Sequence, residues 1–191
     1  ERLKKTLTIV RKPSDLDGIG ALILPGVGSF DPAISQLNKT GLIPYLKRWG
    51  SEDKPLLGIC LGLQLLFESS DEGSKAGLGL FKGHIKKLPV DQGERIPHMG
   101  WSLLSQQNQC PLLKTSDKNH WMYFVHSYSA LPTDQSDLAA TTKFGQNQVA
   151  AIVWRGRVGA CQFHPGKSSK NGQLILKRWI HWLNSGAPRL Q

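Results

Sequence analysis

Apolar runs alternate with amphipathic stretches over the first third of the chain. Short apolar runs over Thr6–Val10, Ala21–Leu24 and Leu56–Ile59 predict strands. The stretches over Ala33–Lys39 and Leu42–Trp49 have apolar residues at helical spacing and predict helices. Such alternation of strands and helices is typical of a parallel sheet that is covered by helices on both faces.

The pattern changes after about Leu78. From there to Ala151, short apolar runs are separated by Gly, Pro or Asn, which predicts antiparallel strands added to the sheet. Arg157–Phe163 predicts another strand, and Gln173–Leu183 predicts a closing amphipathic helix. We therefore expect an α/β fold with a doubly wound, mainly parallel central sheet, helices on both faces and added antiparallel strands. No linker interrupts residues 1–191, which predicts a single domain.

The loop Pro25–Gly28 follows the second predicted strand. Beyond it, Asp31 and Pro32 predict the cap and the first turn of the next helix. In sheets of this class, function gathers where parallel strands end. The two glycines of the loop would allow backbone N–H groups to turn toward an anion, although Pro-Gly turns are usually structural.

Cys60 stands at the end of the third predicted strand, between Gly58 and Gly62. This pattern predicts a strand, a sharp turn and a helix, with the thiol at the apex and glycines that leave the turn enough space. We expect the helix N-terminus and its free N–H groups to favour the thiolate. A buried structural cysteine is the alternative for this segment alone.

His164, followed by Pro165, ends the last predicted strand. A lone histidine at a strand end is more often a surface residue than a base. At the same sheet edge as Cys60, however, it could take the thiol proton and later donate it to a leaving amine. Because the two residues are far apart in sequence, only the fold can bring them together.

The 191 residues carry 24 Lys and Arg against 14 Asp and Glu, a net charge of +10. The basic residues are scattered, and the densest groups, Lys4-Lys5 and Lys86-Lys87, are only doublets. This distribution favours a solvated basic surface or a docking face for an acidic protein over a nucleic-acid site.

The chain has three widely spaced cysteines and no apolar stretch of about 18 residues. The cysteines form neither a disulfide framework nor a CxxC metal pair, which favours a reducing compartment. We therefore expect a soluble, cytoplasmic protein without a membrane segment.

Two motifs together resemble the class I glutamine amidotransferases: Gly58-Ile-Cys-Leu-Gly-Leu-Gln64 and Phe163-His-Pro165. Further motifs resemble one branch of that family, the glutaminase subunit of imidazole glycerol phosphate synthase in histidine biosynthesis. They are Pro25–Phe30, Pro97–Trp101, Tyr123–Tyr128 and Gln162–Ser168. The resemblance runs from about Thr6 to Leu183, which is nearly the whole chain.

The resemblance implies that Cys60 attacks the side-chain amide of glutamine while His164 acts as base and then as acid. The backbone N–H of Leu61 and the segment around Val27 and Gly28 would hold the oxyanion. Ammonia would pass to the cyclase subunit, a (β/α)8 barrel that forms a heterodimer with this chain, and no cofactor or metal is implied. The positions that match glutamine-binding residues are Gly28, Gln64, Glu72, Ser127 and Tyr128. The positions that match the cyclase interface are Trp101, Tyr123 and Lys167.

The chain departs from the family pattern in two places. Gly166 stands where the family has the glutamate that orients the histidine, which puts the rate in doubt rather than the reaction class. The family also begins with a further strand and helix, of which only a last turn near Glu1–Lys5 would be present. We expect the missing strand to be central in the sheet, so that a chain without it should fold poorly. We therefore expect the domain as given to be N-terminally truncated.

Three function classes stay open. The chain is an active glutaminase subunit, an inactive pseudo-subunit that still docks on the cyclase, or a glutaminase that serves another synthase. Gly166 favours the second class, and the motifs Pro97–Trp101 and Tyr123–Tyr128 argue against the third. A basic nucleic-acid binder is a distant fourth.

Overall fold

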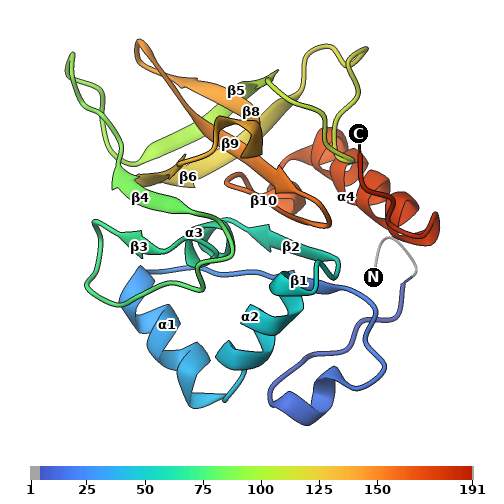
Figure 1. Ribbon diagram of the computed structural model, residues 1–191. Helices are drawn as coiled ribbons and strands as arrows, with labels where there is room; N and C mark the ends of the chain where they lie inside the picture. The colour runs from blue at the N-terminus through green and yellow to red at the C-terminus, as the bar shows by residue number, and fades with distance from the viewer. Residues whose placement is uncertain (1–4, 191) are drawn as a thin grey trace.

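The computed structural model describes residues 5–190, which form two sheets and four α-helices (Figure 1). The larger sheet has seven strands in the order β1-β2-β10-β9-β8-β5-β6, and the smaller has three in the order β3-β4-β7. The strands of the larger sheet are β1 Leu22–Leu24, β2 Leu56–Ile59, β5 His98–Gln106, β6 Trp121–His126, β8 Leu138–Phe144, β9 Asn147–Arg155 and β10 Val158–Cys161. The other elements are β3 Ser69–Ser70, β4 Gly83–Lys87, β7 Tyr128–Pro132, α1 Phe30–Lys39, α2 Ile43–Ser51, α3 Leu61–Leu65 and α4 Ser169–Asn184.

The core of the larger sheet is parallel. Strand β2 lies between β1 and β10 and pairs with both in the same direction, with Leu57 opposite Ile23 and Gly159. The remaining strands β9, β8, β5 and β6 extend the sheet in antiparallel fashion. The predicted α/β class, with antiparallel strands added to a parallel core, is therefore confirmed.

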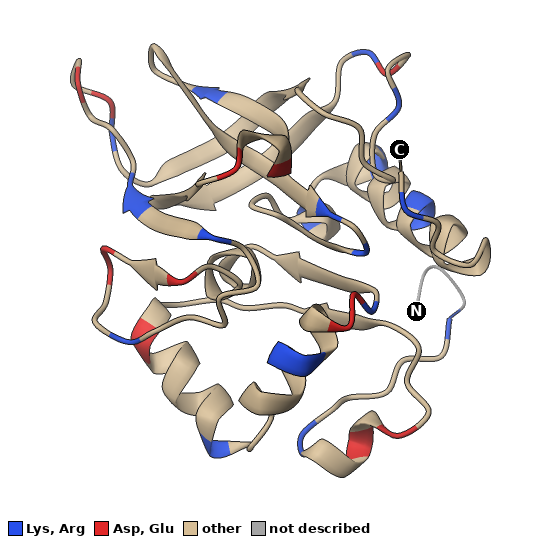
Figure 2. Cartoon of the chain, viewed as in Figure 1, with Lys and Arg blue, Asp and Glu red and all other residues tan. Residues whose placement is uncertain are grey.

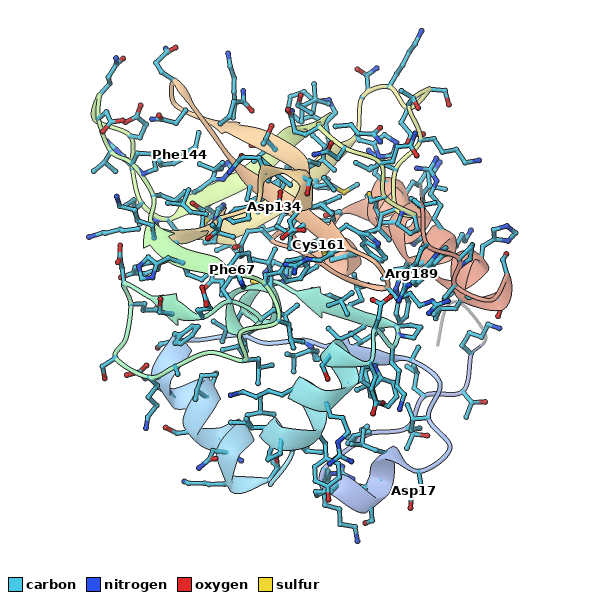
Figure 3. The ribbon with its side chains drawn as sticks, in the orientation of Figure 1. Asp17, Phe67, Asp134, Phe144, Cys161 and Arg189 are labelled. Carbon is cyan, nitrogen blue, oxygen red and sulfur yellow. The ribbon has the colours of Figure 1, made fainter. Side chains whose placement is uncertain are left out.

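Helices cover both faces of this core because side chains alternate along each strand (Figure 1). On one face α4 packs Trp179 and Trp182 against Leu57 and Cys161. On the other face α2 packs Trp49 against Leu56, beside Val10, Leu16 and Ile19. Each face buries a continuous apolar cluster, and Phe67 and Cys161 are fully enclosed inside the molecule (Figure 3).

The predicted strand over Thr6–Val10 is wrong. The segment forms no strand, and no strand of the described residues pairs with it. Leu7 and Ile9 are 70% and 68% exposed. An apolar run without a hydrogen-bonding partner has no means of becoming a strand. The helical turn expected near Glu1–Lys5 lies, apart from Lys5, outside the described residues.

The predicted start of α1 is also wrong by two residues. The cap is Ser29 and the helix begins at Phe30. The Asp31 carboxylate instead accepts hydrogen bonds from the backbone N–H groups of Ser74 and Lys75, each at 3.0 Å. A tertiary contact therefore uses the side chain that the sequence pattern assigned to local capping.

Lys and Arg residues are distributed over helices, strands and loops, with Asp and Glu residues among them (Figure 2). Within residues 5–190, no helix is both long enough and apolar enough to cross a membrane.

Candidate active site

Cys60 lies in the turn between β2 and α3 and has an unusual backbone conformation. Its φ is 55° and its ψ is −114°, a region that costs a non-glycine residue roughly 1–3 kcal/mol. Its N–H donates to the carbonyl of Cys161 at 2.8 Å, which ties the turn to the end of the neighbouring strand β10. The strand, sharp turn and helix that the sequence predicted are all present, with the thiol at the apex.

The two flanking glycines are required by the space around the turn. A Cβ on Gly62 would clash with the carbonyl oxygen of Leu24, and one on Gly58 would lie 2.9 Å from the Cβ of Ala160. The turn can therefore approach β1 and β10 only with glycine at these positions.

Burial raises the pKa of the Cys60 thiol above its ordinary value of 9.0. The Leu61 N–H and the positive charge of Lys167 both lower this pKa, but burial outweighs them. The expected preference for the thiolate is thus present as a local effect of the helix start and is not the net result. A base that removes the proton is needed.

His164 lies just beyond β10, at the same edge of the sheet as Cys60. The register places Cys161 of β10 opposite Ile59 of β2, so the segments that follow these two strands leave the sheet side by side. Burial, and secondarily Lys167, lowers the pKa of His164 below its usual 6.5, so the imidazole is neutral at pH 7. Neutral imidazole is the form that can accept a thiol proton. The charge of Lys167 therefore acts on the pKa of both groups.

Backbone contacts hold the His164 segment against β6. The His164 N–H donates to the carbonyl of Tyr123 at 3.0 Å. The Ser168 hydroxyl donates to the His164 carbonyl at 2.7 Å and accepts from the Tyr123 N–H at 2.9 Å. The position of the base thus depends on strand β6.

Gly166 lies in a short 3-10 turn, Pro165–Lys167, and is exposed. Among the described residues, no carboxylate forms a hydrogen bond or an ion pair with the imidazole of His164. Nothing lies within 4 Å of a Cβ built on Gly166, and its φ is not in the left-handed region. The site therefore has room for a larger side chain at this position.

The loop Pro25–Gly28 lies beside the start of α3. A Cβ on Gly26 would lie 3.1 Å from the Cβ of Leu61, which shows how closely the two segments approach. Gly28 has a φ of +91°, and Val27 is 82% exposed. Glu72 meets the end of this loop, since its Oε2 accepts from the Phe30 N–H at 2.9 Å.

Gln64 is buried beside Tyr128 and Gln162. Its Nε2 donates to the Tyr128 carbonyl and to Gln162 Oε1, each at 3.2 Å. Gln162 Nε2 in turn faces the Cys60 sulfur at 4.0 Å. Ser127 is half-buried between β6 and β7, and its carbonyl accepts from Leu88 at 2.9 Å. Most of the predicted glutamine-binding residues therefore belong to one polar network around the thiol or to the loop beside it.

Trp101 and Tyr123 lie opposite each other on β5 and β6, with ring centroids 5.9 Å apart. Trp101 is 50% exposed, and Lys167 is also exposed. Trp101 and Tyr123 belong to a larger apolar face, here called the hairpin face, which the sequence interpretation did not identify as a whole. Its members are Met99, Trp101, Leu103, Trp121, Tyr123 and Val125, paired across the two strands.

The sequence interpretation also missed three polar residues of the interior: His126 and Gln162, which are buried, and His98, which is half-buried. Each of them stands inside a motif already noted, Pro97–Trp101, Tyr123–Tyr128 or Gln162–Ser168. Burial of a polar side chain in a strand was the property that could have marked them, but a single sequence does not give burial.

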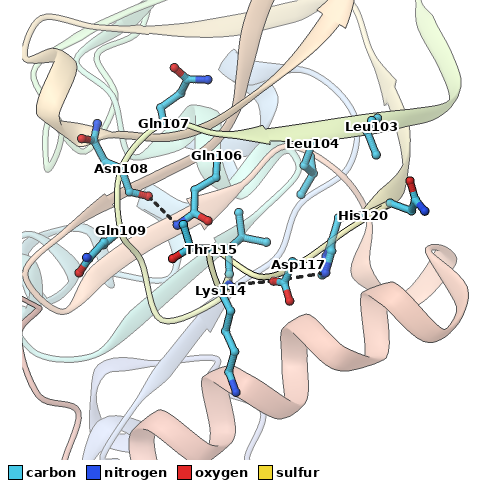
Figure 4. A pocket seen from close by; sticks show the side chains of 12 residues that line it. Leu103, Leu104, Gln106, Gln107, Asn108, Gln109, Lys114, Thr115, Asp117 and His120 are labelled. Atoms are coloured by element: carbon cyan, nitrogen blue, oxygen red, sulfur yellow. Dashed lines mark hydrogen bonds and ion pairs between the residues drawn. The ribbon is translucent and has the colours of Figure 1, made fainter.

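A separate polar pocket of about 600 Å³ lies between the end of β5 and the loop that precedes β6 (Figure 4). Beside it, the guanidinium of Arg178 lowers the pKa of Asp117 to about 2, and His120 is within 3.3 Å of the same carboxylate. None of the predicted site residues lines this pocket. Within residues 5–190, no group of three or more His, Cys, Asp or Glu side chains is arranged to hold a metal ion.

The family described as glutamine amidotransferase class-I matches residues 2–182 of the chain. The chain is 61% identical over 187 residues to "Imidazole glycerol phosphate synthase subunit HisH 2" of Prochlorococcus marinus strain MIT 9313, covering 98% of this chain and 88% of that protein. It is 60% identical to "Imidazole glycerol phosphate synthase subunit HisH" of Synechococcus sp. strain CC9605, with the same coverage. A solved structure titled "Crystal structure of glutamine amidotransferase" has a TM-score of 0.70 at 20% identity, covering 94% of this chain and 89% of that one. At that identity the structure supports the fold alone.

Proposed function

The chain belongs to the class I glutamine amidotransferase family, and from this premise we propose that it hydrolyses glutamine and delivers ammonia within imidazole glycerol phosphate synthase. The observation that carries the proposal is the strained turn at Cys60, beside a neutral His164 at the same sheet edge. The relatives named above are subunits of that synthase, and they support the assignment to histidine biosynthesis.

The proposed reaction begins when His164 takes the thiol proton and the Cys60 sulfur attacks the amide carbon of glutamine. The Leu61 N–H, which already faces the thiol, stabilises the negative oxygen that forms. Return of the proton from His164 to the amide nitrogen expels ammonia and leaves a glutamyl thioester. Water, deprotonated by His164, then releases glutamate and restores the thiol.

The substrate lies, in this proposal, between the polar network and the glycine loop. The side-chain oxygen of Gln64, Oε1, accepts no hydrogen bond from the described residues and is free to receive one from the substrate. Glu72 supplies a carboxylate for the substrate ammonium, beside Gly28 at the other wall. Val27 and Gly28 contribute a second oxyanion donor if the loop turns one of its N–H groups toward the thiol, and Tyr128 and Ser127 close the site.

The hairpin face is the proposed docking surface for the cyclase subunit. Four of its six residues, Met99, Trp101, Leu103 and Trp121, are 43–62% exposed, and the Trp101–Tyr123 aromatic pair stands at its centre. Such a group of exposed apolar side chains is typical of a docking surface. Lys167 is three residues from His164, and its charge lowers the pKa of both His164 and Cys60. A partner that pairs with Lys167 would therefore also change the pKa of both groups.

A second candidate is a docking subunit without glutaminase activity. The observation that favours it is the lack of an orienting carboxylate at His164, where Gly166 stands. Such a protein would retain the hairpin face and bind the cyclase, and would leave glutamine intact.

The test is ammonia release from glutamine by the wild-type chain, measured alone and with the cyclase and its nucleotide substrate. Cys60→Ala is the matched control, because alanine keeps the backbone and removes only the sulfur. We expect activity in the complex and none in the variant. Equal background rates in both proteins, with complex formation retained, would favour the docking subunit.

A further inference from the structure

Two histidines of the β5–β6 hairpin form a hydrogen-bonded chain with a defined direction. His126 Nδ1 lies 2.8 Å from the Tyr128 carbonyl. A carbonyl can only accept, so the proton is on Nδ1. His126 is only 6% exposed, and burial lowers its pKa to about 4, so the ring is neutral at pH 7. Its Nε2 is therefore an acceptor.

That acceptor determines the state of the next ring. His98 Nδ1 lies 3.0 Å from His126 Nε2 and must donate to it. Burial lowers the pKa of His98 as well, so its Nε2 is left to accept from the Ser102 hydroxyl at 2.9 Å. The ring of His98 is also held by Phe124, stacked at 5.1 Å. One arrangement of protons thus satisfies every contact from Ser102 to the Tyr128 carbonyl.

The same carbonyl connects the histidines to the nucleophile. Tyr128 O accepts from Gln64 Nε2 as well as from His126. Gln64 then holds Gln162, whose Nε2 faces the Cys60 sulfur. From His126 to Gln162 the path draws on β6, β7, α3 and the residue that follows β10. All but β7, which contributes the Tyr128 carbonyl, contribute a side chain.

We propose that His98 and His126 are positioning residues for Cys60, which act by fixing the Tyr128 carbonyl and, through Gln64, the amide of Gln162 beside the sulfur. The proposal rests on the proposed function for its consequence in catalysis. A Gln162 amide held in place presents an N–H to the sulfur, which favours the thiolate that forms during attack. The hydrogen-bonded path begins at Ser102. This residue stands between Trp101 and Leu103 of the hairpin face, but its side chain points to the opposite side of β5.

The test compares His126→Asn with His126→Phe. The side-chain nitrogen of asparagine occupies the place of Nδ1 and keeps the donor to the Tyr128 carbonyl, whereas phenylalanine keeps the ring and removes the donor. His120→Phe is the matched control, because His120 is equally buried, at 7% exposure, and lies outside the path. The readouts are kcat and KM for glutamine in the complex with the cyclase, and the rate at which iodoacetamide alkylates Cys60 in the chain alone.

We expect His126→Phe to lower kcat by about fivefold at unchanged KM, the size expected for one net hydrogen bond. Alkylation of Cys60 should slow in the same variant, while His126→Asn and His120→Phe stay near wild type. Equal values for His126→Phe and His126→Asn would overturn the proposal. If neither the wild type nor any of the three variants hydrolyses glutamine, the proposed function fails. The alkylation rates of Cys60 still decide whether His126 has the positioning role.

A second measurement does not depend on the variants folding. Nitrogen-15 NMR of the unmodified chain reports which ring nitrogen carries the proton. We expect the Nδ1–H tautomer for both His98 and His126. The Nε2–H tautomer at His126 would contradict the proposal, because that ring could not donate to the Tyr128 carbonyl.

Discussion

The parallel core and the antiparallel hairpin contribute to the site in different ways. In the core, β2 and β10 end side by side and deliver Cys60 and His164 directly, the first through a strained turn. The β5–β6 hairpin supplies no reacting group. It holds the His164 segment through the backbone of Tyr123. It reaches Cys60 only indirectly, through His126, the Tyr128 carbonyl and two glutamine side chains.

This difference separates two kinds of requirement. The core needs particular backbone geometry, so its sequence is constrained at glycines and at the cysteine itself. The hairpin, on our proposal, carries a docking surface on its outer face and hydrogen-bonded polar groups on its inner face. Alternation of side chains along β5 allows one strand to carry both. Chemistry and its control are thus located in parts of the sheet that can be tested separately.

Gly62→Ala should have the largest effect, a loss of stability that arises in the parallel core and not in the hairpin. The added Cβ would clash with the Leu24 carbonyl, so we expect a loss of at least about 3 kcal/mol in the free energy of unfolding, as in severe overpacking. Urea unfolding measures it, with Gly166→Ala as the control, since nothing lies within 4 Å of that position. An unchanged stability in Gly62→Ala would show that the turn is not closely packed.

Trp101→Ala should act on the hairpin alone. Truncating a central aromatic of an interface costs about 2–4 kcal/mol of binding, so affinity for the cyclase should fall by at least about thirtyfold. Titration calorimetry measures this change, and iodoacetamide should alkylate Cys60 at the wild-type rate. Tyr45→Ala on α2 is the control, because Tyr45 is similarly exposed, at 44%, on another element. Equal losses in both variants would place the docking surface elsewhere.

The stability of the chain should fall on acidification in a range set by His126. Burial, with smaller contributions from the nearby His98 and His164, lowers its pKa from 6.5 to about 4, and the Tyr128 carbonyl opposes this shift. The unfolded chain therefore binds the proton first, so the stabilisation present above pH 6.5 is lost as the pH falls toward 4. By pH 5 the loss from this residue is about 2 kcal/mol.

Urea unfolding at pH 7 and pH 5 measures the effect, and His126→Asn should reduce the difference. Asp117 provides an internal contrast, because Arg178 lowers its pKa to about 2 and its contribution is lost only below about pH 4. A wild-type stability that is constant from pH 7 to pH 5 would contradict the burial of neutral His126.

Gly166→Glu should have the smallest effect, and it should raise the rate of the reaction at the Cys60–His164 site of the parallel core. The position is open, so a carboxylate can approach the imidazole and stabilise its protonated form during transfer. We expect glutamine hydrolysis in the complex to rise about tenfold, equivalent to about 1.4 kcal/mol, with little change in cyclase affinity. Gly166→Gln is the control for side-chain bulk. A rate that stays the same in Gly166→Glu would show that His164 needs no added carboxylate.

The sequence predicted the core better than the hairpin for physical reasons. The turn at Cys60 follows from local steric rules, and strand β2 has the predicted bounds Leu56–Ile59. The failed strand over Thr6–Val10 and the displaced cap at Asp31 both depend on tertiary partners that a single sequence does not specify. The path from His98 to Gln162 joins residues from distant segments, so only the fold could bring it together.

The measurement that tests the account most directly is the site of labelling by a glutamine-like electrophile, located by peptide mapping. All three cysteines are buried, but Cys60 is the least buried, at 9% exposure, while burial raises the pKa of Cys110 to about 11 and that of Cys161 further still. We predict that Cys60 is labelled first, and that added glutamine slows the labelling. Prior labelling of Cys110 or Cys161, or labelling of Cys60 that glutamine does not affect, would contradict the account.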